Sequence, residues 1–164
     1  MSWSTERLTH LMRDAVEFSV THVESGGLPF VGVVTDEIEY VSEYGVNEVR
    51  ETGDLTAHAE IVAMRATMRQ RGLTNLDGAS LLATGEPCGL CYRFAVRHGI
   101  GRVYAAVDSA TVAEWGFDYR RSYKALGVDG ARLAEIVTPL PVSGGLKPFE
   151  RYLLINNPAG HVAS

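Results

Sequence analysis

The chain has 164 residues, of which 46% are hydrophobic and 21% are charged. These values predict one globular domain over residues 1–164, because the length suits a single core and the composition is not that of a disordered chain. The net charge of -5 argues against a nucleic-acid partner, since proteins that grip phosphates usually present a basic surface. No apolar run reaches the roughly 18 residues of a membrane span, and the N-terminus lacks the apolar core of a signal peptide. We therefore expect a cytoplasmic protein without a membrane partner.

The first half of the chain is predicted to form a helix, a hairpin and a second helix. Apolar residues recur at helical spacing over residues 8–23, and two glycines follow. Residues 30–35 are typical of a buried strand, and residues 38–46 are predicted to be its hairpin partner. After a loop, residues 58–71 have the apolar spacing of a helix that ends at Gly72.

Strands and helices alternate in the second half. The expected elements are a strand at 79–84, a helix from Pro87 to about 98, a strand at 102–107, a helix at 119–126, a last strand at 132–137 and a helix from Pro148. This order predicts a three-layer α/β/α domain with a central mixed five-stranded sheet. The tail, about 138–164, carries apolar residues that need burial, and a partner subunit could supply it.

Cys88 and Cys91 are the two cysteines of the chain, and their spacing places both sulfurs on one face of a helix. In a reducing cytosol such a pair indicates a metal or redox site rather than a disulfide. His58 opens another predicted helix, and both helix starts can face one point. Three ligands of these types predict a tetrahedral zinc ion with one open position, where water can bind and be activated. The positive ends of two helix dipoles favour the thiolates.

Glu60 is too close in sequence to His58 for both to bind the metal from one helical face. It is better placed beside the water, as a group that moves protons from the water to a ring nitrogen and then to a departing amine. Taken alone, Glu60 could simply balance the helix dipole. The order H-x-E followed by P-C-x-x-C is, however, the signature of zinc-dependent nucleobase deaminases.

The chain resembles the cytidine deaminase superfamily over roughly residues 26–152. The resemblance is carried by TAHAEI at residues 56–61, TGEPCGLC at 84–91 and IGRVY at 100–104. Two further segments, EWGFD at 114–118 and LKPF at 146–149, point to the bacterial guanine deaminase branch. The resemblance implies hydrolytic deamination of a small aminated heterocycle, with ammonia released and one zinc ion in each subunit.

The resemblance also implies substrate-binding residues and an assembly. Asn47 matches an asparagine that hydrogen-bonds the base, and Phe30 matches an aromatic residue of the base pocket. A turn role for Asn47 and a core role for Phe30 are the alternatives. Members of the superfamily are often homodimers, and in this branch the C-terminal segment is exchanged and closes the partner's site. A hinge at Gly144-Gly145 would suit such an exchange.

Four more residues are candidates for the substrate pocket. Glu86 can point at the substrate or cap a helix. The loop with Trp115, Phe117 and Asp118 can shape the pocket, whereas aromatic residues of this kind also serve as core. Glu150 and the basic residues around Arg93 are expected to be solvated charges.

The sequence departs from the family pattern at three positions. Leu55 stands where proline is usual, and Val31 stands where glycine is usual. Tyr119 takes the place of a second acidic residue that is common in guanine deaminases after Gly-Phe-Asp. A tyrosine cannot repeat the contact of a carboxylate with the donor edge of guanine. The predicted substrate is therefore guanine-like, cytosine-like or s-triazine-like.

Other functions account for parts of the same pattern. A nucleoside or nucleotide deaminase and a tRNA-editing adenosine deaminase share the fold, although the acidic charge disfavours the latter. A non-enzymatic binding module would need a closed structural zinc with a fourth ligand from His10, His22, His98 or His161. A thioredoxin-like redox pair would explain the cysteines but not His58 and Glu60.

Overall fold

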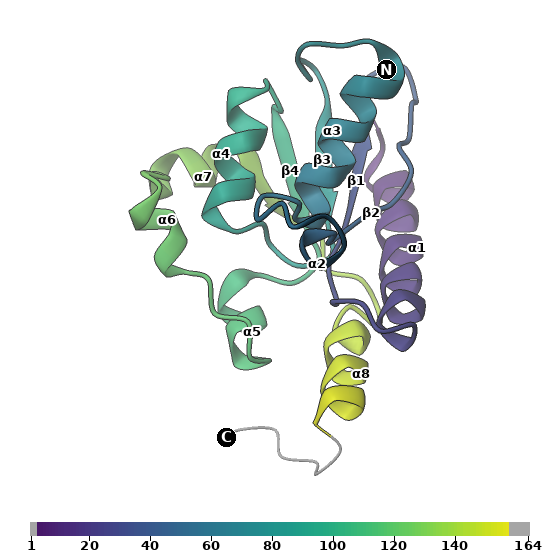
Figure 1. The fold of residues 1–164 in the computed structure, drawn as a ribbon. Coiled ribbons are helices and arrows are strands. Elements are labelled where there is room, and N and C mark those ends of the chain that lie inside the picture. Colours follow the sequence, from purple (N-terminus) through teal and green to yellow (C-terminus); the bar gives the residue numbers. More distant parts are fainter. Residues whose placement is uncertain (1–2, 158–164) are drawn as a thin grey trace.

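A mixed five-stranded sheet with the strand order β2-β1-β3-β4-β5 forms the centre of the structure, a computed structural model that describes residues 3–157 (Figure 1). The strands are β1 Val31–Thr35, β2 Gly45–Val46, β3 Ser80–Ala83, β4 Arg102–Ala105 and β5 Val137–Pro139. Strand β1 runs antiparallel to β2 and β3, whereas β3, β4 and β5 are parallel. The predicted mixed sheet is confirmed.

The helices cover both faces of this sheet. They are α1 Thr5–Glu24, α2 Val49–Thr52, α3 Ala59–Arg71, α4 Gly89–Arg97, α5 Ser109–Glu114, α6 Arg121–Ala125, α7 Gly130–Ile136 and α8 Lys147–Asn156. Alternate residues of β1 point to opposite sides, as strand geometry requires. Val33 packs with Met12 of α1 and Phe149 of α8, whereas Val34 packs with residues of α3 and α4. The three-layer arrangement is therefore confirmed (Figure 1).

Helix α3 lies very close to the sheet, and two glycines make this approach possible. A Cβ atom on Gly32 would lie 2.9 Å from the Cα of Glu60, and one on Gly45 would lie 2.2 Å from the carbonyl oxygen of Ala59. Any larger residue would therefore push the start of α3 away from β1 and β2. These glycines fix the position of the turn that carries His58, Ala59 and Glu60.

Two predicted strands were wrong in detail, and two short helices were not predicted. Over residues 38–46 only Gly45–Val46 forms a strand, because the Asp36 side chain accepts hydrogen bonds from the amides of Ile38 and Tyr40, at 2.9 Å each, and builds a turn there instead. The expected strand 132–137 is mostly helix α7, which Asp129 caps, and β5 starts only at Val137. Helices α2 and α5 were not predicted.

The start of α4 is also shifted from the prediction. Pro87 does not occupy the first helical position, because Cys88 is the N-cap and the helix begins at Gly89.

Within residues 3–157, no helix combines the length and apolar character needed to cross a bilayer.

The Asp36 side chain connects the turn that follows β1 to α3, and it makes the free energy of unfolding depend on pH. Burial alone would raise its pKa, but hydrogen bonds from Arg71 and the two turn amides outweigh that effect and lower the pKa below 3.8. The stabilisation is therefore present above about pH 4 and is lost as the pH falls through the folded-state pKa. We expect Asp36→Asn to lower the free energy of unfolding by about 1 kcal/mol at pH 7. Urea unfolding of the variant at pH 7 and pH 3 should show a smaller loss at pH 3; an equal loss at both would contradict this role.

Candidate active site

Three predicted metal ligands meet at the starts of two helices. His58 is the N-cap of α3, Cys88 is the N-cap of α4, and neither side chain caps its own helix by a hydrogen bond. The Nδ1 atom of His58 lies 3.4 Å from the sulfur of Cys88 and 3.4 Å from that of Cys91. The two sulfurs are 3.7 Å apart, and both cysteines are free. The site lies beyond the carboxyl end of β3, where open α/β sheets commonly bind ligands.

The spacing of these three atoms fits a zinc ion. With zinc–sulfur bonds of about 2.3 Å and a zinc–nitrogen bond of about 2.0 Å, a tetrahedral centre has edges of roughly 3.5–3.8 Å between ligand atoms. Among residues 3–157, no fourth histidine, cysteine or carboxylate joins the group. His22 stacks on Phe18 and His98 pairs with the Phe94 carbonyl, whereas His161 lies outside the described residues. The donor set therefore fits one zinc ion with an open fourth position.

Of the two thiols, that of Cys88 is already biased towards ionisation, whereas the hydrogen bond with Cys88, together with burial and the nearby Glu60, raises the pKa of Cys91. The hydrogen bonds that Cys88 shares with Cys91 and, to a smaller extent, with His58 lower the pKa of Cys88 to about 4 against the opposing effect of burial. The positive end of helix α4 is at the same place. A thiolate is the form that binds zinc, so the sequence builds a ready metal ligand at this N-cap.

Glu60 lies in the first turn of α3 and is buried, with 5% of its surface exposed. Its Oε2 atom accepts a hydrogen bond from the Cys91 thiol at 3.3 Å. Burial is the main cause that raises the pKa of Glu60 to about 7. A carboxyl group with a pKa in this range can both take up and release protons near neutral pH.

A pocket of about 150 Å³ opens onto His58, Cys88 and Glu60. Its apolar wall consists of Leu28, Phe30, Ala59, Phe117 and Tyr119, and its polar wall adds Asn47 and Glu86. Phe30 and Phe117 meet edge to face with ring centroids 5.2 Å apart, and Phe149 of α8 supports both rings from behind. The walls suit a flat ring, because edge-to-face aromatic packing leaves ring faces and edges for a planar ligand.

The polar residues of the pocket are held by the protein. The Oδ1 atom of Asn47 accepts a hydrogen bond from the Val49 amide at 3.1 Å, which leaves the NH₂ group as the free donor. The carboxylate of Glu86 accepts hydrogen bonds from the Tyr92 hydroxyl at 2.9 Å and from the Ser109 amide at 2.8 Å. The Tyr119 hydroxyl donates to the Glu86 carbonyl oxygen.

Two of the residues singled out from the sequence lie away from this pocket. Asp118 is exposed and forms an ion pair with Arg120 at 2.8 Å, and the half-buried Trp115 packs against the hydrophobic core. Leu28 and Ala59 line the pocket although the sequence analysis did not select them. Ala59 could have been found, because it stands between His58 and Glu60 in the motif, whereas Leu28 carries no such signal.

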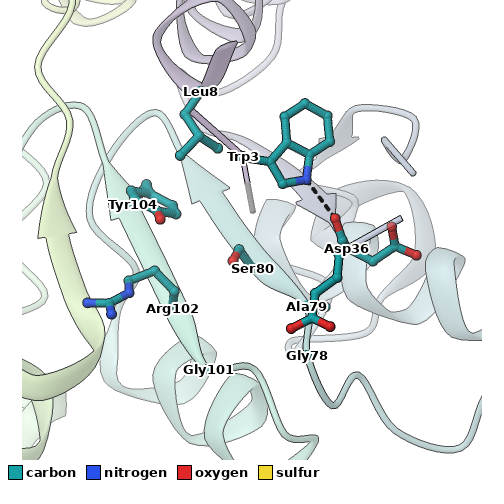
Figure 2. Close-up of a pocket in the computed structure, with 10 residues that line it drawn as sticks. Trp3, Leu8, Asp36, Gly78, Ala79, Ser80, Gly101, Arg102 and Tyr104 are labelled. Carbon is teal, nitrogen blue, oxygen red and sulfur yellow. Dashed lines mark hydrogen bonds between the residues drawn. The ribbon is translucent and has the colours of Figure 1, made fainter. Parts of the chain in front are cut away.

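A larger hollow of about 540 Å³ lies at the other end of β3 and β4, between the start of α1 and the sheet. Figure 2 shows Trp3, Asp36, Ser80, Arg102 and Tyr104 around it, with the Trp3 indole donating a hydrogen bond to the Asp36 carbonyl oxygen at 2.6 Å. No residue of the segments 56–61 and 84–91, which carry the predicted zinc ligands and Glu60, lines it. The smaller pocket, which is lined by His58, Glu60 and Cys88, is therefore the candidate active site.

Comparison with known proteins supports this choice. The profile of the cytidine and deoxycytidylate deaminase zinc-binding region matches residues 5–107. Guanine deaminase of Bacillus subtilis is 28% identical over 142 residues, which are 86% of this chain and 90% of that protein. Its X-ray structure has a TM-score of 0.65 at 27% identity, with 86% of this chain and 90% of that chain covered.

Two further relatives extend the comparison. The structure of guanine deaminase from Nitrosomonas europaea has a TM-score of 0.70, covers 86% of this chain and 81% of that chain, and at 22% identity shows a shared fold. The tRNA-specific adenosine deaminase of Aquifex aeolicus is 35% identical over 86 residues. That match covers 52% of this chain and 56% of the relative, so the chain spans little more than half of it.

Proposed function

Because the chain belongs to the family that shares the cytidine and deoxycytidylate deaminase zinc-binding region, we propose that it deaminates a free aminated base of guanine, cytosine or s-triazine type. The reaction class is zinc-dependent hydrolytic deamination of a nucleobase, in which water replaces an amino group and ammonia leaves. The observation that carries the proposal is a buried glutamate and a His/Cys/Cys group at the bottom of one small aromatic pocket.

His58, Cys88 and Cys91 would hold the zinc ion, which when bound supplies Lewis-acid activation of water. Glu60 takes a proton from the attacking water and passes it to a ring nitrogen. The same carboxylate then takes the remaining proton of the added hydroxyl and delivers it to the departing amine, so that the carbonyl forms and ammonia leaves. Its burial keeps bulk water from competing for these protons, and its pKa of about 7 suits both directions of transfer.

The pocket walls would select the ring. Phe30 and Phe117 would contact the ring of the base, and the NH₂ group of Asn47 would donate to a carbonyl oxygen or ring nitrogen. At Tyr119 the hydroxyl already donates to the Glu86 carbonyl, so it offers the substrate an uncharged acceptor at most. We expect weaker discrimination between purine and smaller rings than a carboxylate at this position would provide.

A nucleoside is the second candidate substrate, and one observation favours it. A groove of about 450 Å³ adjoins the pocket, shares Leu28 and Asn47 with it, and is lined by polar side chains such as Arg50 and Tyr152. A sugar attached to the ring would lie in this groove. Relatives that edit tRNA leave a third candidate, which the net charge of -5 disfavours.

A panel of substrates tests the proposal. Ammonia release by the zinc-loaded protein is measured with guanine, cytosine, adenine, aminated s-triazines and the matching nucleosides. We expect turnover of at least one free base, with kcat/KM higher than for its nucleoside. Turnover of nucleosides alone would favour the second candidate, in which the sugar lies in the groove. No turnover of any compound would contradict the proposed function.

We further propose a cytoplasmic homodimer in which the tail, about 138–164, is exchanged between subunits. Leu154 and Ile155 of α8 are 63% and 45% exposed, so a partner surface would bury apolar area. In the described structure α8 packs on α1 of its own chain, with Arg151 and Glu24 3.6 Å apart. Free cysteine ligands suit a reducing compartment.

Chemical crosslinking distinguishes an exchanged tail from a retained one. Cysteines are placed by Glu24→Cys and Arg151→Cys, and a short bis-maleimide joins them in the zinc-loaded protein. Exchange is expected to give a covalent dimer on a denaturing gel at twice the 17.8 kDa chain mass. A crosslinked single chain would show that the tail stays on its own α1. Each single-cysteine variant serves as the control for random collisions.

A further inference from the structure

The loop that carries Cys88 is held by a short segment far away in the sequence. We call residues 86–89 the metal loop and residues 119–123 the clamp segment. Three side chains of the clamp segment, those of Tyr119, Ser122 and Tyr123, each bind one backbone group of the metal loop. No side chain of the clamp segment is a zinc ligand.

The three hydrogen bonds reach successive parts of the metal loop. Tyr119 donates to the carbonyl oxygen of Glu86, and Tyr123 donates to that of Pro87 at 2.8 Å. The Gly89 amide donates to the Ser122 hydroxyl at 2.8 Å, and this hydroxyl donates in turn to the Tyr119 carbonyl oxygen at 2.5 Å.

These contacts determine the direction of the Cys88 side chain. The proline ring already fixes φ of Pro87, and the hydrogen bond from Tyr123 to its carbonyl fixes the remaining rotation there. The hydrogen bond between Gly89 and Ser122 fixes the next peptide plane. Because the peptide planes on both sides of Cys88 are held, the direction of its Cα–Cβ bond is set, and only rotation about that bond remains.

Two further observations support the same arrangement: the lack of space around Gly89 and a second hydrogen bond between α4 and the end of α6. A Cβ atom on Gly89 would lie 2.5 Å from the Ser122 carbonyl oxygen, so this position has room for glycine alone. At the other end of α6, Arg93 of α4 donates to the Leu126 carbonyl oxygen at 2.7 Å. Helix α6 is therefore attached to α4 at both ends, and its first attachment, at Gly89, is also the end of the metal loop.

We propose that Ser122 and Tyr123 are positioning residues that set the affinity for zinc by holding the two peptide planes that flank Cys88. The inference rests on the proposed function only in taking His58, Cys88 and Cys91 as the zinc ligands. Partners that orient a metal ligand through hydrogen bonds typically change metal affinity by about 10–100-fold when they are lost. Neither residue lines the substrate pocket, whereas Tyr119 does, so the first two give the cleaner test.

Zinc affinity is measured by competition with a chromogenic chelator for wild type, Tyr123→Phe, Ser122→Ala and the double variant. Tyr104→Phe, on β4 at the opposite end of the sheet, is the matched control for loss of a tyrosine hydroxyl. Melting temperatures of the zinc-free proteins report a general loss of stability.

We expect about 10-fold weaker zinc binding in each single variant and a larger loss in the double variant, with zinc-free melting temperatures close to wild type and Tyr104→Phe unchanged. Zinc affinity within threefold of wild type in all variants would overturn the inference. A zinc-free melting temperature that falls in step with affinity would show a merely structural role and would also overturn it. This experiment measures zinc binding and not activity. Its result therefore does not depend on whether the substrate panel shows any turnover.

Discussion

Substituting Glu60 by glutamine is expected to lower kcat/KM by about 10²–10⁴-fold while zinc stays bound. Glutamine has nearly the same shape as the buried glutamate, so the pocket of about 150 Å³ should keep its form. What the variant loses is the ability to take up a proton near neutral pH and return it to the leaving amine. Ammonia release on the best substrate of the panel measures the loss, and elemental analysis measures zinc.

Glu114→Gln is the matched control, because Glu114 is an exposed glutamate at the end of α5 and does not line the pocket. It should retain the wild-type rate. If Glu60→Gln keeps more than about a tenth of wild-type activity with zinc bound, the proton-transfer role is wrong. If the variant is inactive because it has lost zinc, Glu60 acts on the metal site instead.

The metal site could be predicted from the sequence because its information is local. His58 and Glu60 are two residues apart, Cys88 and Cys91 are three apart, and each pair sits at the start of a helix whose boundaries glycine and proline mark. The structure brings the two pairs to within 3.4 Å, as their shared position beside the sheet required.

The pocket wall was harder to predict, because its residues are set by distant contacts. Tyr119 faces the pocket and bonds the Glu86 carbonyl, whereas the neighbouring Asp118 turns outward to Arg120. A one-residue difference decides which side chain points inward, and the hydrogen bond from Tyr119 to the metal loop holds that orientation. No periodicity within residues 114–120 reports that contact.

The errors in the fold have the same origin. Residues 132–137 form a short and mostly apolar run that can be taken for a strand, but Asp129 caps a helix that begins at Gly130 and continues to Ile136. Over residues 38–46 the Asp36 carboxylate takes the amides that a strand would offer to its neighbour. In both places the hydrogen bonds of a single aspartate side chain determine the backbone conformation. The pattern of apolar residues does not reveal which backbone amide that side chain binds.

Zinc removal is expected to destabilise the wild-type protein strongly and to leave a Cys91→Ala variant unaffected. Ligand binding to the folded state adds about 4 kcal/mol when the free metal is a thousandfold above Kd, which for a domain of this size raises Tm by about 10 °C. Cys91 is fully buried and supplies one of the three ligands, so its loss leaves two ligands and an unfilled position.

Thermal unfolding of both proteins, with added zinc and with excess chelator, measures this difference. We expect a Tm shift of about 10 °C in wild type and almost none in Cys91→Ala. His10→Ala, which changes a histidine in α1 away from the site, should keep the wild-type shift. An equal shift in Cys91→Ala would place the stabilising zinc elsewhere. The absence of a shift in wild type would mean that zinc does not bind the folded protein tightly, which would contradict the proposed metal site.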